Sequence, residues 1–139
     1  MSIEANKAIV RRYQEAYNAN QLDALDELVA ADIITPQRLP GFPDGLAGLK
    51  QLHQMTLEAW PDLHTSLDRL IADGDWVVAH LTLTATPVKA AFGVPATGRS
   101  FKIRGIFAVR IAGGKIVEHR GWEDALGIMQ QLTSGSAGG

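Results

Sequence analysis

The stretch from Phe101 to Leu132, FKIRGIFAVRIAGGKIVEHRGWEDALGIMQQL, predicts a strand, a tight turn, a second strand and a short helix. Between Phe101 and Val109 one face collects Phe, Ile, Gly, Phe and Val at every second position, which is typical of a strand with one buried face. Gly113 and Gly114 supply the positive φ angles that a tight hairpin turn requires. The stretch therefore predicts an antiparallel hairpin followed by a helix.

The second strand of this hairpin carries the densest set of reactive side chains. Alternation places Val117, His119 and Gly121 on one face. The opposite face is expected to carry Ile116, Glu118, Arg120 and Trp122. Asp124 follows at the N-cap position of the predicted helix. A His and a carboxylate therefore lie within one turn of chain at the mouth of a sheet, and they form the best site candidate.

The segment GKIVEHRGWEDALGIMQQL, from Gly114 to Leu132, resembles the C-terminal signature of the SnoaL-like polyketide cyclases, which belong to the nuclear transport factor two superfamily. The resemblance extends from about Asn6 to Leu132. It implies an α+β fold, a cone-shaped α+β barrel in which three N-terminal helices pack on a strongly curved mixed, mostly antiparallel sheet. Because this fold hosts many activities, the resemblance indicates the family more strongly than the reaction.

The chain departs from the resembling cyclases at two positions. Members that cyclise anthracycline precursors carry a catalytic Asp two residues after the His, where this chain has Gly121, and a second His where it has Phe107. The resemblance also implies a pocket residue at Tyr17 and a polar cavity group near Thr35, which can supply a hydrogen bond but no charge. The cyclase mechanism therefore does not transfer intact.

Length and composition are typical of one globular domain. The chain has 139 residues, 46% hydrophobic and 20% charged, which predicts a single domain over residues 1–132. Residues 133–139, TSGSAGG, are expected to form a flexible tail. A net charge of −2 without a basic run argues against nucleic acid as a partner. The absence of cysteine excludes disulfides, thiolate catalysis and Cys-ligated zinc.

Targeting and cofactor signals are not found in the sequence. The N-terminal residues MSIEANKAIV lack the features of a signal peptide, and no apolar run reaches membrane-spanning length, so a cytoplasmic protein that does not contact membranes is expected. Four scattered His residues argue against a metal site. No glycine-rich phosphate loop or nucleophile elbow occurs, and we expect no cofactor.

The N-terminal part predicts helices followed by a hairpin. The expected helices are Ile3 to Asn18, a short one from Leu22 to about Ala31, and Leu46 to Trp60, and the expected strands are Leu63 to Ala72 and Trp76 to Ala85. An extended segment, 32–36, is predicted after the second helix, and a loop over 87–98. Tyr13 is interpreted as a core residue and His53 as a boundary residue of the third helix.

The predicted pocket is largely apolar and suits a flat aromatic or polyketide ligand. Its expected lining is Tyr17, Leu52, Trp60, Phe107, Val117 and His119. His119 is the preferred base or proton shuttle, because imidazole titrates near neutral pH, although a hydrogen-bonded structural role remains the alternative. Asp124 is expected either to orient His119, to act as the base itself, or only to cap the helix, which stabilises by about 1 kcal/mol.

Three function classes remain open. The first is a cofactor-independent cyclase that uses acid–base chemistry of the intramolecular aldol type on a hydrophobic small molecule. The second is a divergent relative that assists polyketide hydroxylation, or an isomerase or hydrolase. The third is a non-catalytic binding module. In each case we expect a homodimer joined through sheet faces, since the predicted outer face is partly apolar. That face carries Trp76, His80, Arg104, Ile106, Arg120 and Trp122.

Overall fold

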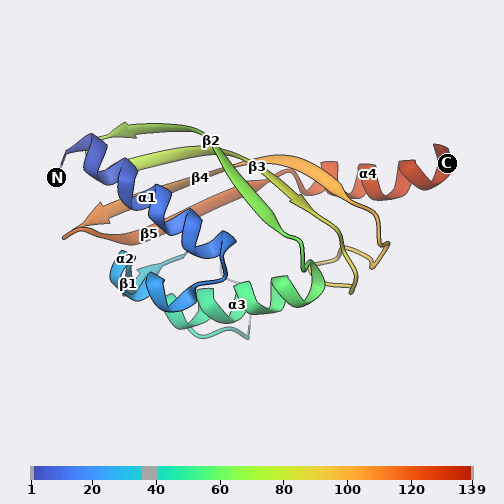
Figure 1. Ribbon diagram of the computed structural model, residues 1–139, viewed down its shortest axis with the longest axis horizontal. Helices are drawn as coiled ribbons and strands as arrows, with labels where there is room; N and C mark the ends of the chain where they lie inside the picture. Colours follow the sequence, from blue (N-terminus) through green and yellow to red (C-terminus); the bar gives the residue numbers. More distant parts are fainter. Residues whose placement is uncertain (1, 36–40, 139) are drawn as a thin grey trace.

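One mixed sheet and the helices on its concave side make up the body of the protein (Figure 1). The computed structural model describes residues 2–35 and 41–138. The elements in chain order are α1 (Ile3–Asn18), a 3-10 turn (Leu22–Ala24), α2 (Leu25–Leu28), β1 (Val29–Ile34), α3 (Gly45–Ala59), β2 (His64–Asp73), β3 (Trp76–Ala85), β4 (Phe101–Ala112), β5 (Lys115–Glu123) and α4 (Ala125–Gly138).

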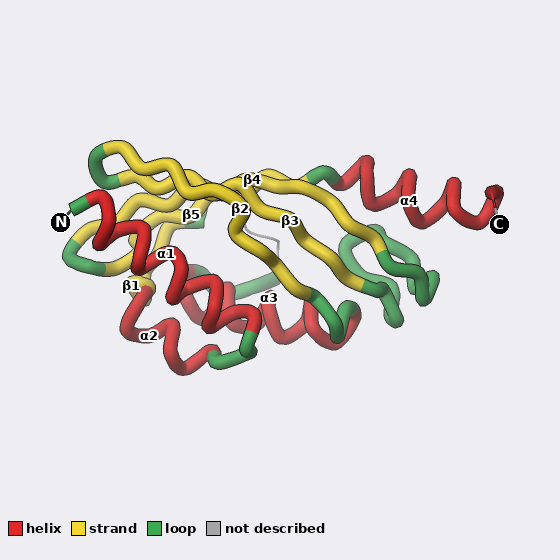
Figure 2. Tube along the Cα trace, turned by 45° about the horizontal axis from the view of Figure 1, so that its top comes forward, coloured by secondary structure: helices red, strands yellow, loops and turns green. Residues whose placement is uncertain are grey.

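The sheet is long, twisted and curved, as Figure 2 shows. Its strand order is β1-β5-β4-β3-β2; β1 runs parallel to β5, and the other neighbours are antiparallel. The helices α1, α2 and α3 lie on one side, while α4 follows β5, buries Ile128 and Leu132 in the core and continues to the C-terminal end of the molecule (Figure 1). The predicted α+β class with a mostly antiparallel curved sheet is confirmed.

The core lies between the concave face of the sheet and the helices. On β4 the residues Phe101, Ile103, Phe107 and Val109 are at most 5% exposed, which confirms the predicted alternation. Apolar residues at helical spacing on α1 pack against these β4 residues, and Val10 among them is fully buried. Because each such side chain contributes about 1.5–3 kcal/mol when fully buried, this interior holds the helices against the sheet.

The N-terminal helix has the predicted bounds, whereas the second helix is shorter than expected. The Ser2 hydroxyl accepts a hydrogen bond from the Ala5 amide at 3.0 Å and caps α1. The second helix ends at Leu28 instead of near Ala31, because Val29 already pairs with Ile116 on β5. Pairing with a neighbouring strand outweighs the local helix preference here.

The inward and outward residues of β5 differ from the prediction at one end of the strand. Ile116 was expected to face outward, but it is fully buried in the core. The register shifts between Arg110 and Ile111, so that Ile116 lies opposite Ile111 and a β-bulge falls at Val117. The bulge changes the phase of the alternation, which a strictly two-residue pattern does not anticipate.

The hairpin turn and the C-terminal helix complete the architecture. Gly113 and Gly114 adopt φ angles of 60° and 78°, as the turn between β4 and β5 requires. The helix α4 extends from Ala125 to Gly138. Among the described residues no helix is long and apolar enough to cross a membrane.

Candidate active site

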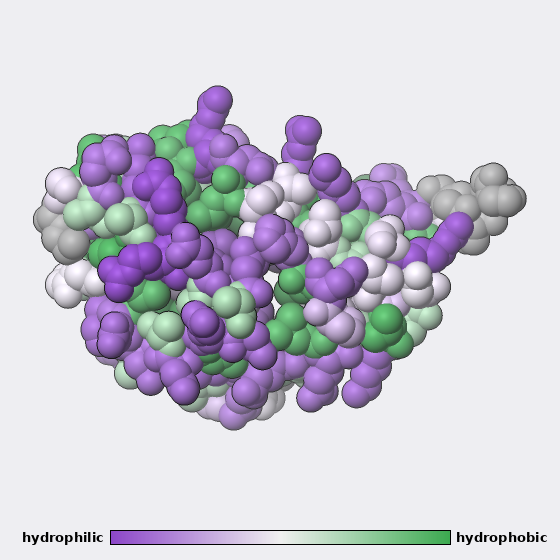
Figure 3. Space-filling model, viewed as in Figure 1, coloured by the Kyte–Doolittle hydropathy of each residue, from purple (hydrophilic) through white to green (hydrophobic). Residues whose placement is uncertain are grey.

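A cavity of about 480 Å³ lies between the concave face of the sheet and the helices α1 and α3. Its volume falls within the range of small-molecule sites. On the face seen in Figure 3 a hollow opens between the sheet and α3, with hydrophobic residues beside it. Six of the residues proposed from the sequence line the cavity: Tyr17, Leu52, Trp60, Phe107, His119 and Gly121.

Three of the proposed residues are not among the described residues that line the cavity: Thr35, Val117 and Asp124. Thr35 directly follows β1, and Val117 lies at the β-bulge. The Asp124 carboxylate accepts a hydrogen bond from the Gly127 amide at 2.9 Å, while its backbone carbonyl accepts one from the Ile128 amide. This geometry favours the helix-capping role of Asp124 over the catalytic one.

His119 lies in the inner wall of the cavity on β5, opposite Val109 of β4. Its ring stacks on Phe107 with centroids 5.1 Å apart and lies 6.1 Å from the ring of Tyr13. Burial lowers the pKa of His119 to about 4, so the imidazole is neutral at pH 7. The near-neutral pKa expected from the sequence is therefore shifted by desolvation. A neutral imidazole still donates at one nitrogen and accepts at the other.

Two tyrosines on α1 extend this wall. Tyr13 and Tyr17 meet edge to face with centroids 4.8 Å apart, and both line the cavity. Burial is the main cause that raises the pKa of each; the hydrogen bond between the two side chains raises the pKa of Tyr13 further and partly offsets the rise for Tyr17. Both phenols therefore remain protonated hydrogen-bond donors at neutral pH. Tyr13, interpreted from the sequence as core, is buried and also part of the cavity wall.

His53 is a cavity residue that the sequence analysis treated as a boundary residue. Its Nε2 lies 3.1 Å from the Tyr17 backbone oxygen, so in the neutral ring Nε2 carries the proton and donates it. Burial lowers the pKa of His53 and keeps the ring neutral. The signal was available: Leu49 and Thr56, which also line the cavity, lie four residues before and three residues after His53, at helical spacing.

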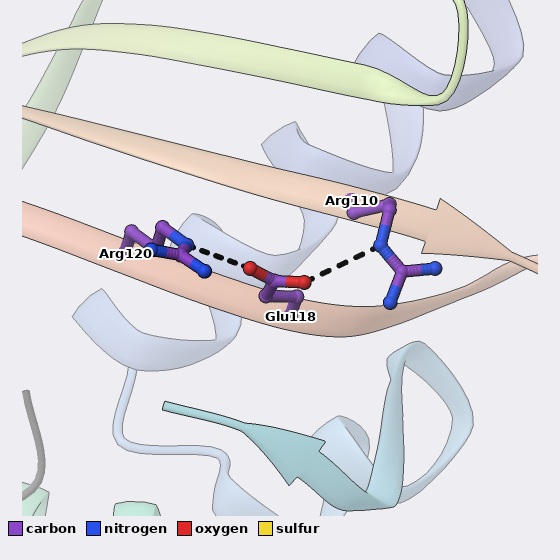
Figure 4. A network of polar contacts seen from close by, with 3 residues as sticks. All are labelled: Arg110, Glu118 and Arg120. Atoms are coloured by element: carbon purple, nitrogen blue, oxygen red, sulfur yellow. Dashed lines mark hydrogen bonds and ion pairs between the residues drawn. The ribbon is translucent and has the colours of Figure 1, made fainter. Parts of the chain in front are cut away.

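Glu118, directly before His119, faces away from the cavity. Figure 4 shows its carboxylate between two guanidinium groups, with Arg120 Nε at 2.6 Å and Arg110 Nε at 3.4 Å. The hydrogen bond from Arg120 is the main reason that the pKa of Glu118 is lowered. Its charge is thus compensated on the outer row of β5, and it does not line the cavity.

Glu123 is a second cavity residue that the sequence analysis missed. It is the last residue of β5 and lines the cavity on the same row as His119 and Gly121. The residue is exposed at the mouth, yet protein packed around its carboxyl desolvates it and raises its pKa. Extending the alternation of Val117, His119 and Gly121 by one step would have identified it.

Gly121 leaves open space beside His119. A Cβ atom at this position would meet only the His119 Cε1 atom within 4 Å, at 3.4 Å. A side chain is therefore sterically compatible with position 121 and would extend toward the imidazole. Among residues 2–35 and 41–138, no three His, Asp or Glu side chains form a group that could hold a metal ion.

Comparisons with known proteins place this chain in a family. The family model of the SnoaL-like polyketide cyclases matches residues 7–132. The aklanonic acid methyl ester cyclase DnrD of Streptomyces peucetius is 34% identical over 130 residues, covering 89% of this chain and 88% of the relative. The nogalonic acid methyl ester cyclase of Streptomyces nogalater is 32% identical over 120 residues, covering 84% of this chain and 89% of the relative.

A solved structure agrees with these matches. The structure of TsrD from Streptomyces laurentii superposes with a TM-score of 0.86 at 26% identity, covering 96% of this chain and 98% of TsrD. The chain therefore belongs to the SnoaL-like polyketide cyclase family.

Proposed function

We propose that this protein is a cofactor-independent polyketide cyclase, which closes a ring in an aromatic polyketide methyl ester by an intramolecular aldol reaction. The observation that carries the proposal is the largely apolar cavity of about 480 Å³ with His119 in its wall. Its curated relatives are cyclases of aklanonic and nogalonic acid methyl esters, and substrates of that class are flat, apolar and rich in carbonyl groups.

The proposed chemistry needs proton transfer and positioning. A carbon flanked by two carbonyls is acidic enough for a positioned base to remove its proton, and the resulting enolate attacks a carbonyl of the same molecule. Holding both carbons in contact replaces a bimolecular encounter. The neutral His119 imidazole donates a hydrogen bond to the carbonyl under attack and stabilises the alkoxide that forms there. Tyr17 adds a protonated hydroxyl to the same wall.

The test is ring closure by the purified protein on a panel of aromatic polyketide methyl esters, starting with aklanonic acid methyl ester. We expect a product of unchanged mass with one new carbon–carbon bond, identified by mass spectrometry and NMR. A ligand that binds, as measured by quenching of tryptophan fluorescence, but returns chemically unchanged would contradict the proposal and favour a binding module.

A second candidate is a relative with changed chemistry. Phe107 stacks on His119 where the resembling cyclases carry a second His, and Gly121 contributes no side chain. The same assay separates the classes, because a hydroxylated product is heavier by one oxygen and a hydrolysed ester loses its methyl group. A product of unchanged mass without a new ring would indicate an isomerase.

We also propose that two copies associate through the outer face of the sheet. His80, Ile106 and Trp122 lie side by side across β3, β4 and β5, and Trp122 is 54% exposed. Apolar surface of this kind is typical of an isologous dimer interface. Light scattering should give the mass of a dimer, and Trp122→Glu should give a monomer. A monomeric wild type at all concentrations would refute this.

A further inference from the structure

The inner row of β5 ends in a carboxylate. His119, Gly121 and Glu123 follow one another on the side of the strand that faces the cavity, and all three line it. Successive residues of such a row are about 6.6–6.8 Å apart along the strand. Glu123 therefore lies two such steps from His119, toward the mouth, and the open position 121 lies between them.

A glycine on the neighbouring strand makes room for this side chain. Glu123 pairs with Gly105 of β4, which in turn pairs with Leu81 of β3. A Cβ atom at Gly105 would lie 3.0 Å from Leu81 Cδ1 and 3.5 Å from Glu123 Cγ. The Glu123 side chain thus lies over the bare backbone of Gly105, on the same side as Leu81, which is a cavity residue.

The carboxylate of Glu123 has different contacts from the carboxylates of Glu118 and Asp124 in the same segment. Glu118 is paired with two arginines, and Asp124 caps α4. Within the part of the chain that the structure describes, no hydrogen bond or ion pair engages the Glu123 carboxylate. Burial is the single cause that raises its pKa. At a ligand cavity, an unpaired carboxylate whose pKa is raised by the protein packed around it is a stronger base than a fully solvated one.

Other titratable groups border Glu123 on its outer side. Asp68, Arg69, His80 and Arg104 share with it a second hollow at the convex face. His119 is the titratable group that lines the cavity on the same strand row. None of these groups shifts the pKa of Glu123, which burial alone raises.

We propose that Glu123 is the base that removes the C–H proton of the substrate, an inference that rests on the cyclase function proposed above. The carboxylate takes the proton as the C–H bond breaks, and the electron pair forms the enolate. The enolate carbon bonds to the second carbonyl, whose oxygen becomes an alkoxide and accepts a proton from the Glu123 carboxylic acid. The product is an isomer of the substrate, and the carboxylate is regenerated without an oxidant or reductant.

The division of roles follows from the spacing. His119, deep in the wall, holds the carbonyl oxygen, while Glu123 reaches the acidic carbon from the mouth. The two reacting carbons must therefore meet between these side chains, where the Glu123 carboxylate reaches them from the mouth and the His119 imidazole from the inner wall. Open space at Gly121 accommodates the two carbons as they come into contact.

The experiment separates proton removal from ring closure. Exchange of the activated hydrogens of an aromatic β-keto methyl ester is followed by NMR in D₂O, and ring closure is measured in parallel. Glu123→Gln should slow the enzyme-catalysed exchange by about 10²–10⁴-fold, the usual effect of a general base. Glu123→Asp should be intermediate, and Gly121→Asp/Glu123→Gln should restore much of the rate. Glu118→Gln, the same change on the outer row, is the matched control and should exchange like wild type.

The outcomes distinguish this inference from the proposed function. If wild type catalyses hydrogen exchange but no ring closure, and Glu123→Gln abolishes the exchange, the result supports Glu123 as the base and overturns the cyclase function. If wild type closes the ring and the folded Glu123→Gln variant exchanges hydrogen as fast as wild type, Glu123 is not the base, and the cyclase function is unaffected. Wild type that binds the ester without accelerating exchange also overturns the inference.

Discussion

The inner and outer rows of β5 carry similar chemical groups in different electrostatic states. On the outer row Glu118 is bracketed by Arg110 and Arg120, and these arginines lower its pKa. On the inner row, desolvation favours the neutral form of both His119 and Glu123: it lowers the pKa of His119 and raises the pKa of Glu123. Charge compensation stabilises a fold, whereas uncompensated desolvation raises the proton affinity of a carboxylate and lowers that of an imidazole.

The largest expected effect comes from the inner row. Replacing His119 by Gln should reduce ring-closing turnover by about 10²–10⁴-fold, because the hydrogen bond to the developing alkoxide is lost. Arg120→Gln, one residue further on the outer row, is the matched control and should keep turnover near that of wild type. Steady-state kinetics on the same substrate measures the turnover of both variants, and circular dichroism checks that both fold. Equal turnover losses in the two variants would contradict the division between the rows.

The pH dependence of stability provides a second comparison. The folded-state pKa of His119 is about 4 against an ordinary value of 6.5, so the unfolded chain binds the extra proton first. Stability should therefore fall as the pH drops from 6.5 to 4, with His119 responsible for about 3 kcal/mol. Urea unfolding at several pH values measures this.

The matched variant isolates the effect of His119. His119→Gln should flatten the curve in this window, while the contribution of His53, whose pKa burial also lowers, remains in both proteins. Parallel curves for wild type and His119→Gln would show that His119 is not desolvated.

The contribution of Glu118 on the outer row to stability should be lost at a lower pH than that of His119. Because arginine contacts lower the folded-state pKa of Glu118, its contribution is present above the ordinary value of 4.5 and is lost as the pH falls through the lowered pKa. Glu118→Gln should lower the melting temperature at pH 7 and converge with wild type in strong acid. A constant difference at all pH values would mean that the ion pairs contribute nothing.

The smallest expected effect concerns Asp124, at the boundary between the strand and α4. Asp124→Ala removes the cap on the Gly127 amide and should cost about 1 kcal/mol of stability. Asp124→Asn keeps a capping oxygen and should be nearly neutral. Both variants should turn over substrate like wild type, and a turnover loss in Asp124→Asn at unchanged stability would restore the catalytic interpretation of Asp124.

The sequence predicted those parts of the fold that depend on local patterns. The alternation on β4, the Gly113–Gly114 turn and the stripe of α1 each depend on neighbouring residues, and the structure has them where they were expected. The β-bulge at Val117 depends on the partner strand β4, and the short α2 depends on pairing of β1 with β5. Such long-range contacts leave no periodic signal, and they explain the errors at Ile116 and at the end of the second helix.

The candidate site was partly predictable for the same reason. His119, Gly121 and Phe107 follow from strand alternation, and all three line the cavity. The pKa of His119 depends on burial against Phe107 and Tyr13, two residues from other elements, and so a near-neutral value was expected instead. The alternation also puts Glu123 on the row of His119 and Glu118 on the opposite row, but the different electrostatic states of the two carboxylates depend on their surroundings and required the three-dimensional structure.

A crystal structure with a bound aromatic polyketide methyl ester would show whether the inner row of β5 is the site of proton transfer. We expect the ligand to fill the cavity, with a carbonyl oxygen within hydrogen-bonding distance of the His119 imidazole and the activated carbon against the Glu123 carboxylate. A ligand bound at the outer face of the sheet, or one in the cavity with its reactive carbons away from both side chains, would contradict it.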